Sequence, residues 1–292
     1  MVPRLTSDET SKAARLRTAR ELNSPLPPGE EVALWWLGQS GFAIKFGRYT
    51  ILIDVYLSDY LSRKYRGTET PHERLMPPPV EVGELRSVDL ILCSHGHSDH
   101  MDPESCPILM ANNPEARLVY PAAERDRLME LELPRERCLG VDAGDVLCPA
   151  PGVRIDIIPS AHEVLKTNER AQHYFLGFIM TLGDCTIYHS GDCVLYDGLA
   201  EKLAAHRVEI ALLPINGRGK GVPGNMDARE SVSLCEAANI KTLIPHHYGM
   251  FAFNTAEPEE LNGIVAGKDI MCIIPQVGEK IVVRRSDTKG GE

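Results

Sequence analysis

The chain has 292 residues, of which 43% are hydrophobic, so it is long enough to bury a large core. Its 31 basic and 41 acidic residues give a formal net charge of −10, which repels phosphate backbones and argues against nucleic acid as a partner. The longest apolar runs are far shorter than the roughly 20 residues that cross a bilayer, so no membrane association is expected.

Residues 1–30 are polar and mixed in charge, and we expect them to form a helical or extended N-terminal segment without an export signal. The eight cysteines contain no C-x-x-C pair, which agrees with a reducing compartment. These features predict a cytoplasmic protein. Because soluble enzymes are commonly symmetric assemblies, we also expect a homo-oligomer.

Residues 31–285 are predicted to form one domain, and residues 286–292 a flexible tail. The domain opens with VALWWL, GFAIKF and YTILID, three short strands in the order typical of an antiparallel meander. Residues 56–84 mix polar, aromatic and proline residues, which favours a loop insertion at the border of a site. The apolar run VDLILCS that follows is typical of a strand covered on both faces.

Strands and helices then follow one another to the end of the domain. Helices are expected at 103–112, 122–131, 195–206, 227–239 and 258–267. Strands are expected at 154–159, 174–181, 185–190, 209–214, 242–245 and 270–275. Strands flanked by helices in both halves predict an α/β (α+β) fold built as a four-layer αββα sandwich.

The strongest chemical signal is the run SHGHSDH, which follows the buried strand directly. It places three imidazoles and a carboxylate within six positions, and a loop at a strand end can aim such side chains at one point. His95 and His97 can hold one cation while Asp99 and His100 turn toward a second. The run therefore predicts a metal site.

Two cations need ligands from elsewhere, and the loops after later strands offer them. His162 follows IDIIPSA, and Asp192 follows CTIYHSG, where Gly191 lets the backbone pass close to a metal. His246 and His247, in LIPHHYGMF, compete for one further position. If these strands end on one rim, the side chains converge.

Taken together, these motifs resemble the metallo-β-lactamase superfamily from Leu34 to Pro275. The resemblance implies His247 rather than His246 as the last ligand, with His246 a supporting neighbour. It also implies that Asp54, after YTILID, supports the histidine loop by hydrogen bonds. The implied ligands are His95, His97 and His162 on one metal, Asp99, His100 and His247 on the other, and Asp192 on both.

Four stretches resemble a narrower branch, the L-ascorbate-6-phosphate lactonase type: WLGQSGFAIKFG, ILIDVYLSD, PINGRGKGVPGNM and HHYGMFAFNT. This resemblance implies a metallohydrolase of carbohydrate metabolism that opens a phosphorylated sugar-acid lactone. It implies a small anionic substrate and two divalent cations, zinc or manganese, with iron as a further option.

Residues that contact such a substrate are expected in the glycine-rich loop 216–221. Asn216, Arg218 and Lys220 would hold a phosphate, although the same loop also suits an ordinary surface turn. His173 is a further candidate, with packing beside a strand as its alternative.

The expected reaction is attack of a hydroxide that bridges the two cations on the lactone carbonyl. Asp192 holds the bridge, and Asp99 or the second metal assists the departing alkoxide. The alternatives are a phosphodiesterase or phospholipase-type hydrolase on the same metals, and a catalytically silent metal-dependent binding or regulatory protein.

Overall fold

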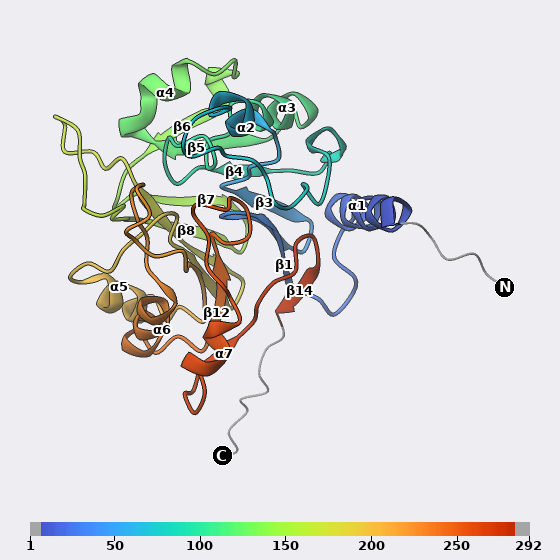
Figure 1. The fold of residues 1–292 in the computed structure, drawn as a ribbon. Helices are drawn as coiled ribbons and strands as arrows, with labels where there is room; N and C mark the ends of the chain where they lie inside the picture. The colour runs from blue at the N-terminus through green and yellow to red at the C-terminus, as the bar shows by residue number, and fades with distance from the viewer. Residues whose placement is uncertain (1–6, 284–292) are drawn as a thin grey trace.

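In the computed structural model residues 7–283 are described, and they form two mixed sheets of seven strands each (Figure 1). The first sheet has the order β14-β1-β2-β3-β4-β5-β6. Its opening strands β1, β2 and β3 are antiparallel, which confirms the predicted meander, and β3 to β6 are parallel. The bounds are β1 (Val32–Gly38), β2 (Gly41–Phe46), β3 (Tyr49–Ile53), β4 (Leu90–Leu92), β5 (Arg117–Pro121), β6 (Cys138–Val141) and β14 (Lys280–Val283).

The second sheet has the order β13-β12-β11-β10-β9-β8-β7. Strands β7 to β10 are antiparallel, and β10 to β13 are parallel. The bounds are β7 (Val146–Ala150), β8 (Val153–Pro159), β9 (Leu176–Leu182), β10 (Cys185–His189), β11 (Ile210–Pro214), β12 (Thr242–His246) and β13 (Met271–Cys272).

The two faces of β1 show how the layers are held together. Successive side chains of a strand point to opposite faces of a sheet. Leu34 and Trp36 join the core between the sheets, whereas Ala33 and Trp35 join a second core on the outer face. All four are buried, so β1 is covered on both sides.

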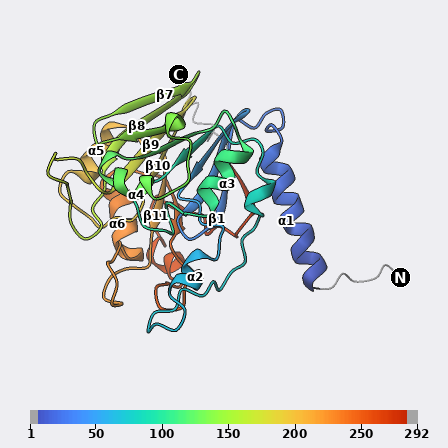
Figure 2. The same cartoon turned by 90° about the horizontal axis from the view of Figure 1, so that it is seen from above.

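Helices cover the outer faces of both sheets, which confirms the four-layer αββα arrangement. Figure 2 shows α1 and α3 on one side of the sheets and α5 and α6 on the other. The helix bounds are α1 (Ser7–Asn23), α2 (Tyr60–Lys64), α3 (Ser105–Asn112), α4 (Arg125–Met129), α5 (Leu199–Ala205), α6 (Ala228–Ala237) and α7 (Glu260–Ile264). Three 3-10 turns accompany them: η1 (Val82–Glu84), η2 (Ala122–Glu124) and η3 (Arg135–Arg137).

The segment 56–84 is not loop throughout, because it contains α2 and η1. The tail predicted at 286–292 lies outside the described residues. Within 7–283, none of the helices has the length and apolar character that crossing a bilayer requires.

Candidate metal centre

The predicted ligands lie on loops that follow strands ending at one edge of the fold. Strands β8, β10 and β12 run in the same direction, because β9 is antiparallel to both its neighbours and β11 is parallel to both of its own. His162, Asp192 and His247 follow the carboxyl ends of these strands. His95 follows β4 of the first sheet, so the centre lies where the edges of the two sheets meet.

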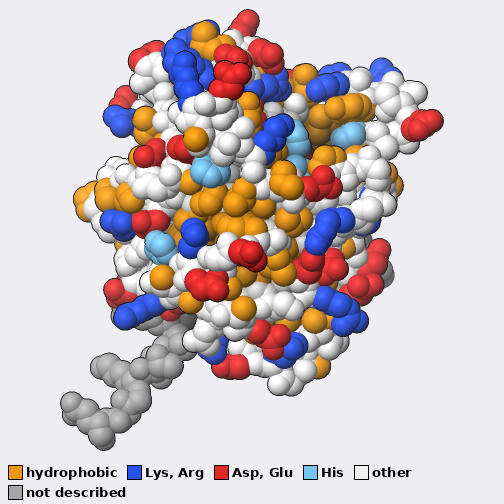
Figure 3. Space-filling model, turned by 90° about the vertical axis from the view of Figure 1, so that its left-hand side faces the viewer, with side chains coloured by type: hydrophobic (Ala, Val, Ile, Leu, Met, Phe, Trp, Pro, Cys, Tyr) orange, Lys and Arg blue, Asp and Glu red, His pale blue; other side chains and the backbone are white. Residues whose placement is uncertain are grey.

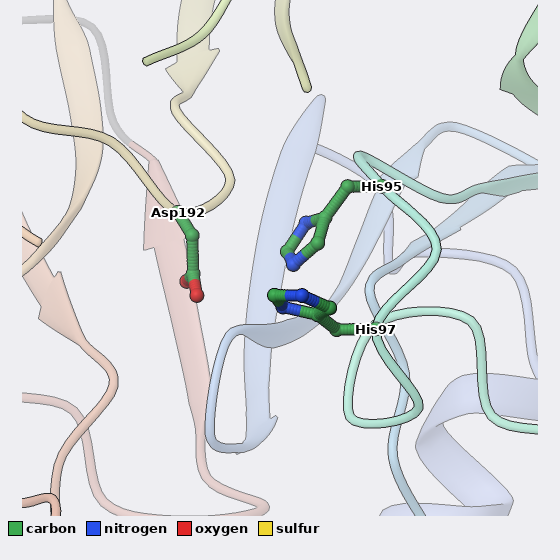
Figure 4. A group of neighbouring side chains, drawn as sticks. All are labelled: His95, His97 and Asp192. Carbon is green, nitrogen blue, oxygen red and sulfur yellow. The ribbon is translucent and has the colours of Figure 1, made fainter. Parts of the chain in front are cut away.

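His95, His97 and Asp192 form one group of ligand atoms, all within 4.8 Å of one another. In Figure 4 the two imidazoles, which share one loop, face the Asp192 carboxylate across a gap. His162 lies beside this group, because its Nε2 is 3.8 Å from Asp192 Oδ2 and its ring is 5.4 Å from that of His97.

Asp99, His100 and His247 form a second group within the same distance limit. His100 Nε2 lies 3.3 Å and His247 Nε2 3.4 Å from Asp192 Oδ1. The two oxygens of Asp192 therefore face different groups, Oδ1 this one and Oδ2 His162. This is the arrangement that a carboxylate shared by two cations needs.

The electrostatics of the two groups fit cations. Burial lowers the pKa of His95 well below its ordinary value, and the imidazoles of His100 and His97 add to the effect. Burial alone would raise the pKa of Asp192, but His247 and His100 outweigh it and hold that pKa well below the usual range. His95 Nε2 and Asp192 Oδ1 are buried without a hydrogen bond. A divalent cation would satisfy both atoms, whose isolation is otherwise costly.

His100 differs from the other imidazoles in its charge. Burial lowers its pKa, but the carboxylates of Asp192, Asp54 and Asp99 outweigh burial and raise the pKa well above the ordinary value. A protonated His100 thus supplies positive charge that a cation would replace.

Asp54 anchors the histidine loop from the end of β3. Its Oδ1 accepts a hydrogen bond from Ser94 N at 2.7 Å, and its Oδ2 accepts bonds from Ser94 Oγ at 2.6 Å and His100 Nδ1 at 2.8 Å. Because His100 donates through Nδ1, its Nε2 is left to face Asp192. Asp54 is fully buried, and its φ of 48° lies in the left-handed region.

Gln39 belongs to the centre although the sequence does not identify it. It lies in the turn between β1 and β2, at a φ of 51°. Its Nε2 donates to Asp99 Oδ2 at 2.9 Å and lies 3.2 Å from His247 Nε2, while its backbone carbonyl oxygen accepts from His247 N at 2.9 Å. No motif distinguishes an amide in a turn as a partner of residues so far along the chain.

The structure separates the two competing histidines. His247 joins the second group, whereas His246 ends β12 and is buried against the ring of His189, with centroids 5.0 Å apart and planes 6° apart. His189 donates from Nε2 to Ser40 O at 2.8 Å and accepts from Gly191 N at Nδ1. His246 therefore packs behind the ligand loops.

A cavity of about 420 Å³ opens over the centre. In Figure 3 histidine, hydrophobic and basic side chains meet at a hollow in the upper part of the face shown. The metal-ligand side of the cavity contains His97, Asp99, His162, Asp192 and His247. Its other lining residues are Gln39, Leu61, Lys64, Tyr65, His72, Gly96, Ser98, Arg127, Val222, Pro223, Phe251, Phe253 and Asn254.

The two basic side chains of the glycine-rich loop, Arg218 and Lys220, do not line this cavity. The Arg218 guanidinium forms an ion pair with Glu230, with a 2.7 Å bond from Nη1 to Oε2. Lys220 Nζ donates to the carbonyl oxygen of Thr255. Both basic side chains therefore bind other residues of the protein.

The other two residues predicted to contact substrate are also bonded elsewhere. Asn216 is buried, and its Nδ2 donates to Asn254 Oδ1 at 2.8 Å. His173 lies with its Nδ1 2.9 Å from Asp142 Oδ1. Neither lines the cavity, although Asn216 orients Asn254, which does.

Comparison with known proteins agrees with this geometry. A family model described as the beta-lactamase superfamily domain matches residues 49–248. The chain is 30% identical over 233 residues to a UPF0173 metal-dependent hydrolase of Hyperthermus butylicus, covering 79% of this chain and 89% of the relative. It is 24% identical over 266 residues to a probable L-ascorbate-6-phosphate lactonase UlaG of Escherichia fergusonii, covering 78% of this chain and 73% of the relative.

Solved structures show the same fold at lower identity. The metallo hydrolase Igni18 of Ignicoccus hospitalis is 19% identical with a TM-score of 0.66, covering 87% of this chain and 99% of that one. The metallo-beta-lactamase fold protein YhfI of Bacillus subtilis is 15% identical with a TM-score of 0.62, covering 86% and 99%. The chain therefore belongs to the metallo-β-lactamase superfamily, as one of its metal-dependent hydrolases.

Proposed function

We propose that this chain opens the ring of a small anionic lactone by hydrolysis. The observation that carries the proposal is the double ligand group around Asp192, set in a cavity large enough for a small molecule. The relative named as an L-ascorbate-6-phosphate lactonase supports the lactone class. The name of that relative suggests a phosphorylated sugar-acid lactone as the particular substrate.

The charges around the cavity support an anionic substrate. Lys64 and Arg127 line it together with the carboxylates of Asp99 and Asp192. Arg127 is held by Glu130 and by a 3.1 Å bond to Ser98 Oγ. The Lys64 ammonium lies 5.3 Å from the centroid of the Tyr65 ring, and within residues 7–283 it forms no ion pair. It is thus the cation at the cavity that is left to meet a substrate anion.

Two divalent cations held by the two ligand groups would supply Lewis acidity, which makes a water more acidic and polarises the carbonyl oxygen. The protein's own contribution is to hold and move protons. Burial raises the pKa of Asp99, but the imidazoles of His100 and His247 outweigh it and lower the pKa. An ionised Asp99, whose Oδ2 accepts a hydrogen bond from Gln39 Nε2, accepts the proton of the attacking water. The same proton then passes to the departing alkoxide, which gives a hydroxyl, and the new carboxylic acid releases the second proton of the water to solvent to become a carboxylate.

The test is hydrolysis of δ-valerolactone, 6-phosphogluconolactone and bis(4-nitrophenyl) phosphate by metal-loaded protein, with and without chelator. We expect metal-dependent turnover of lactones, and a loss of at least about 1000-fold in kcat for Asp192→Ala. Asp156→Ala is the matched control, because this carboxylate pairs with Arg154 away from the centre. Full activity in Asp192→Ala, or turnover of the phosphodiester alone, would contradict the proposal.

A further inference from the structure

Four aromatic rings, called here the aromatic wall, line the cavity beside the metal centre: Tyr65, His72, Phe251 and Phe253. Tyr65 and His72 are stacked with centroids 4.2 Å apart. The His72 ring meets Phe251 and Phe253 edge-on at 5.0 and 4.7 Å. The wall therefore joins two segments that lie almost 180 positions apart in the sequence.

Contacts behind the aromatic wall hold the two segments together. Leu75 N donates to Met250 O at 2.9 Å, which ties the segment 56–84 to the loop after β12. The Arg74 guanidinium donates to the carbonyl oxygens of Tyr56 and Ser58 at 3.1 Å each and lies over the Tyr56 ring. The wall thus has a fixed position relative to the centre.

The partial exposure of the aromatic wall indicates that it is a binding surface and not a part of the hydrophobic core. Phe251 is only 1% exposed and anchors the cluster, whereas Tyr65, His72 and Phe253 are half-buried and line the cavity. Rings whose purpose is packing alone would be covered, because exposed aromatic area is costly. These three line the cavity, where Tyr65 stacks on His72 and also has the Lys64 ammonium 5.3 Å from its ring centroid.

His72 contributes as a neutral ring. Its Nδ1 donates to Thr70 O at 2.8 Å, which fixes the tautomer. Burial lowers the pKa of His72, so the imidazole is uncharged at neutral pH and its face suits another flat ring. Positive charge at the cavity is left to Lys64 and Arg127.

We infer that the aromatic wall binds a flat aromatic ring of the substrate, so that the lactones preferred by this enzyme carry or are fused to an aryl group. The inference rests on the proposed lactone hydrolysis and narrows its substrate class. The ring would lie against the wall and the ester carbonyl toward Asp192, with the substrate anion near Lys64. An aryl group can meet the wall in the offset-stacked or edge-to-face arrangements that aromatic pairs prefer.

The test compares kcat/KM for dihydrocoumarin with that for δ-valerolactone, which has the same lactone ring without the aryl group. Phe253→Leu keeps apolar volume but removes the ring, and we expect the ratio of the two kcat/KM values to fall about fivefold. Phe253→Trp keeps a ring and should retain the preference. Leu195→Ala, an exposed apolar side chain that does not line the cavity, is the control. Comparing ratios removes the difference in intrinsic reactivity between the lactones.

A binding measurement separates this inference from the proposed function. Calorimetry on metal-loaded protein compares the ring-opened products 3-(2-hydroxyphenyl)propanoate and 5-hydroxypentanoate. If no lactone is hydrolysed, the proposed function fails, yet tighter binding of the aromatic acid, lost in Phe253→Leu, still supports the wall. Equal affinities for the two acids, or an unchanged kcat/KM ratio in Phe253→Leu, would overturn the inference.

Discussion

Replacing Asp54 by alanine should weaken metal binding without removing any proposed ligand. The Asp54 carboxylate accepts three hydrogen bonds, from Ser94 N, Ser94 Oγ and His100 Nδ1. The last bond fixes the orientation of the His100 ring, which leaves Nε2 facing the centre. In Asp54→Ala the imidazole can turn, and Ser94 loses the anchor that positions the start of the histidine loop.

The magnitude follows from the bonds that are lost. Supporting partners of metal ligands typically change affinity by about 10- to 100-fold, or about 1.4–2.8 kcal/mol. Loss of a hydrogen bond to a buried carboxylate costs stability as well, about 1.5–3 kcal/mol. We therefore expect a weaker Kd for the second cation, measured by calorimetric titration, and a lower melting temperature in chelator.

A matched control separates the two effects. Asp89 is also hydrogen-bonded to β3, because its Oδ2 accepts a 2.7 Å bond from Thr50 N. This bond lies at the opposite end of the strand from Asp54. Asp89→Ala should lower the melting temperature and leave the metal Kd unchanged. If Asp54→Ala binds both cations as tightly as the wild type, Asp54 does not orient His100 and the reasoning is wrong.

Two further predictions concern the turn at Gln39 and the buried amine of Lys45. In Gln39→Asn the asparagine tolerates the left-handed backbone conformation, but its side chain is too short to reach Asp99. We therefore expect kcat to fall about tenfold in a steady-state assay. An unchanged kcat would show that Gln39 does not belong to the centre. Lys45 Nζ donates to the carbonyls of Leu22 and Ser24, and burial lowers its pKa to about 8. The unfolded chain then binds more protons than the folded chain between about pH 8 and 10.5, so stability should rise across this range. Chemical denaturation should show that rise in the wild type relative to Lys45→Met, and parallel pH profiles of the two would contradict it.

The ligand loops could be predicted because their histidines and aspartates directly follow apolar runs that are typical of strands. Histidines and aspartates directly after apolar runs are placed to bind at a strand end, although His246, in the same kind of position, packs against His189 instead. The structure brings Asp192 and His247 to the loop of His95 and His97, because the strands before them end at the same edge. The support of the histidine loop by Asp54, in contrast, was implied by the family resemblance, and the structure shows it as hydrogen bonds to Ser94 and His100.

Short edge elements and contacts between distant loops gave no comparable signal. Four strands were not predicted, since each has only four or five residues and none carries a long apolar run: β5, β6, β7 and β14. The strand predicted at 270–275 shrinks to β13, Met271–Cys272. Loop composition suggested Arg218 and Lys220 as substrate contacts, but it could not reveal their partners within the protein, Glu230 and the carbonyl oxygen of Thr255.

The centre and the aromatic wall depend on different parts of the chain, which makes them separately testable. The ligands follow strands of the two sheets and are fixed by buried bonds such as that from Ser94 to Asp54. The wall belongs to segments outside the sheets, which are held to each other by the bond from Leu75 to Met250. A change in the wall should therefore alter which substrate is preferred before it alters metal affinity, whereas a change at Asp54 should do the reverse. A Phe253→Leu protein that lost metal affinity and substrate preference together would show that the two are one unit, and the assignment of the wall to substrate would then have no support.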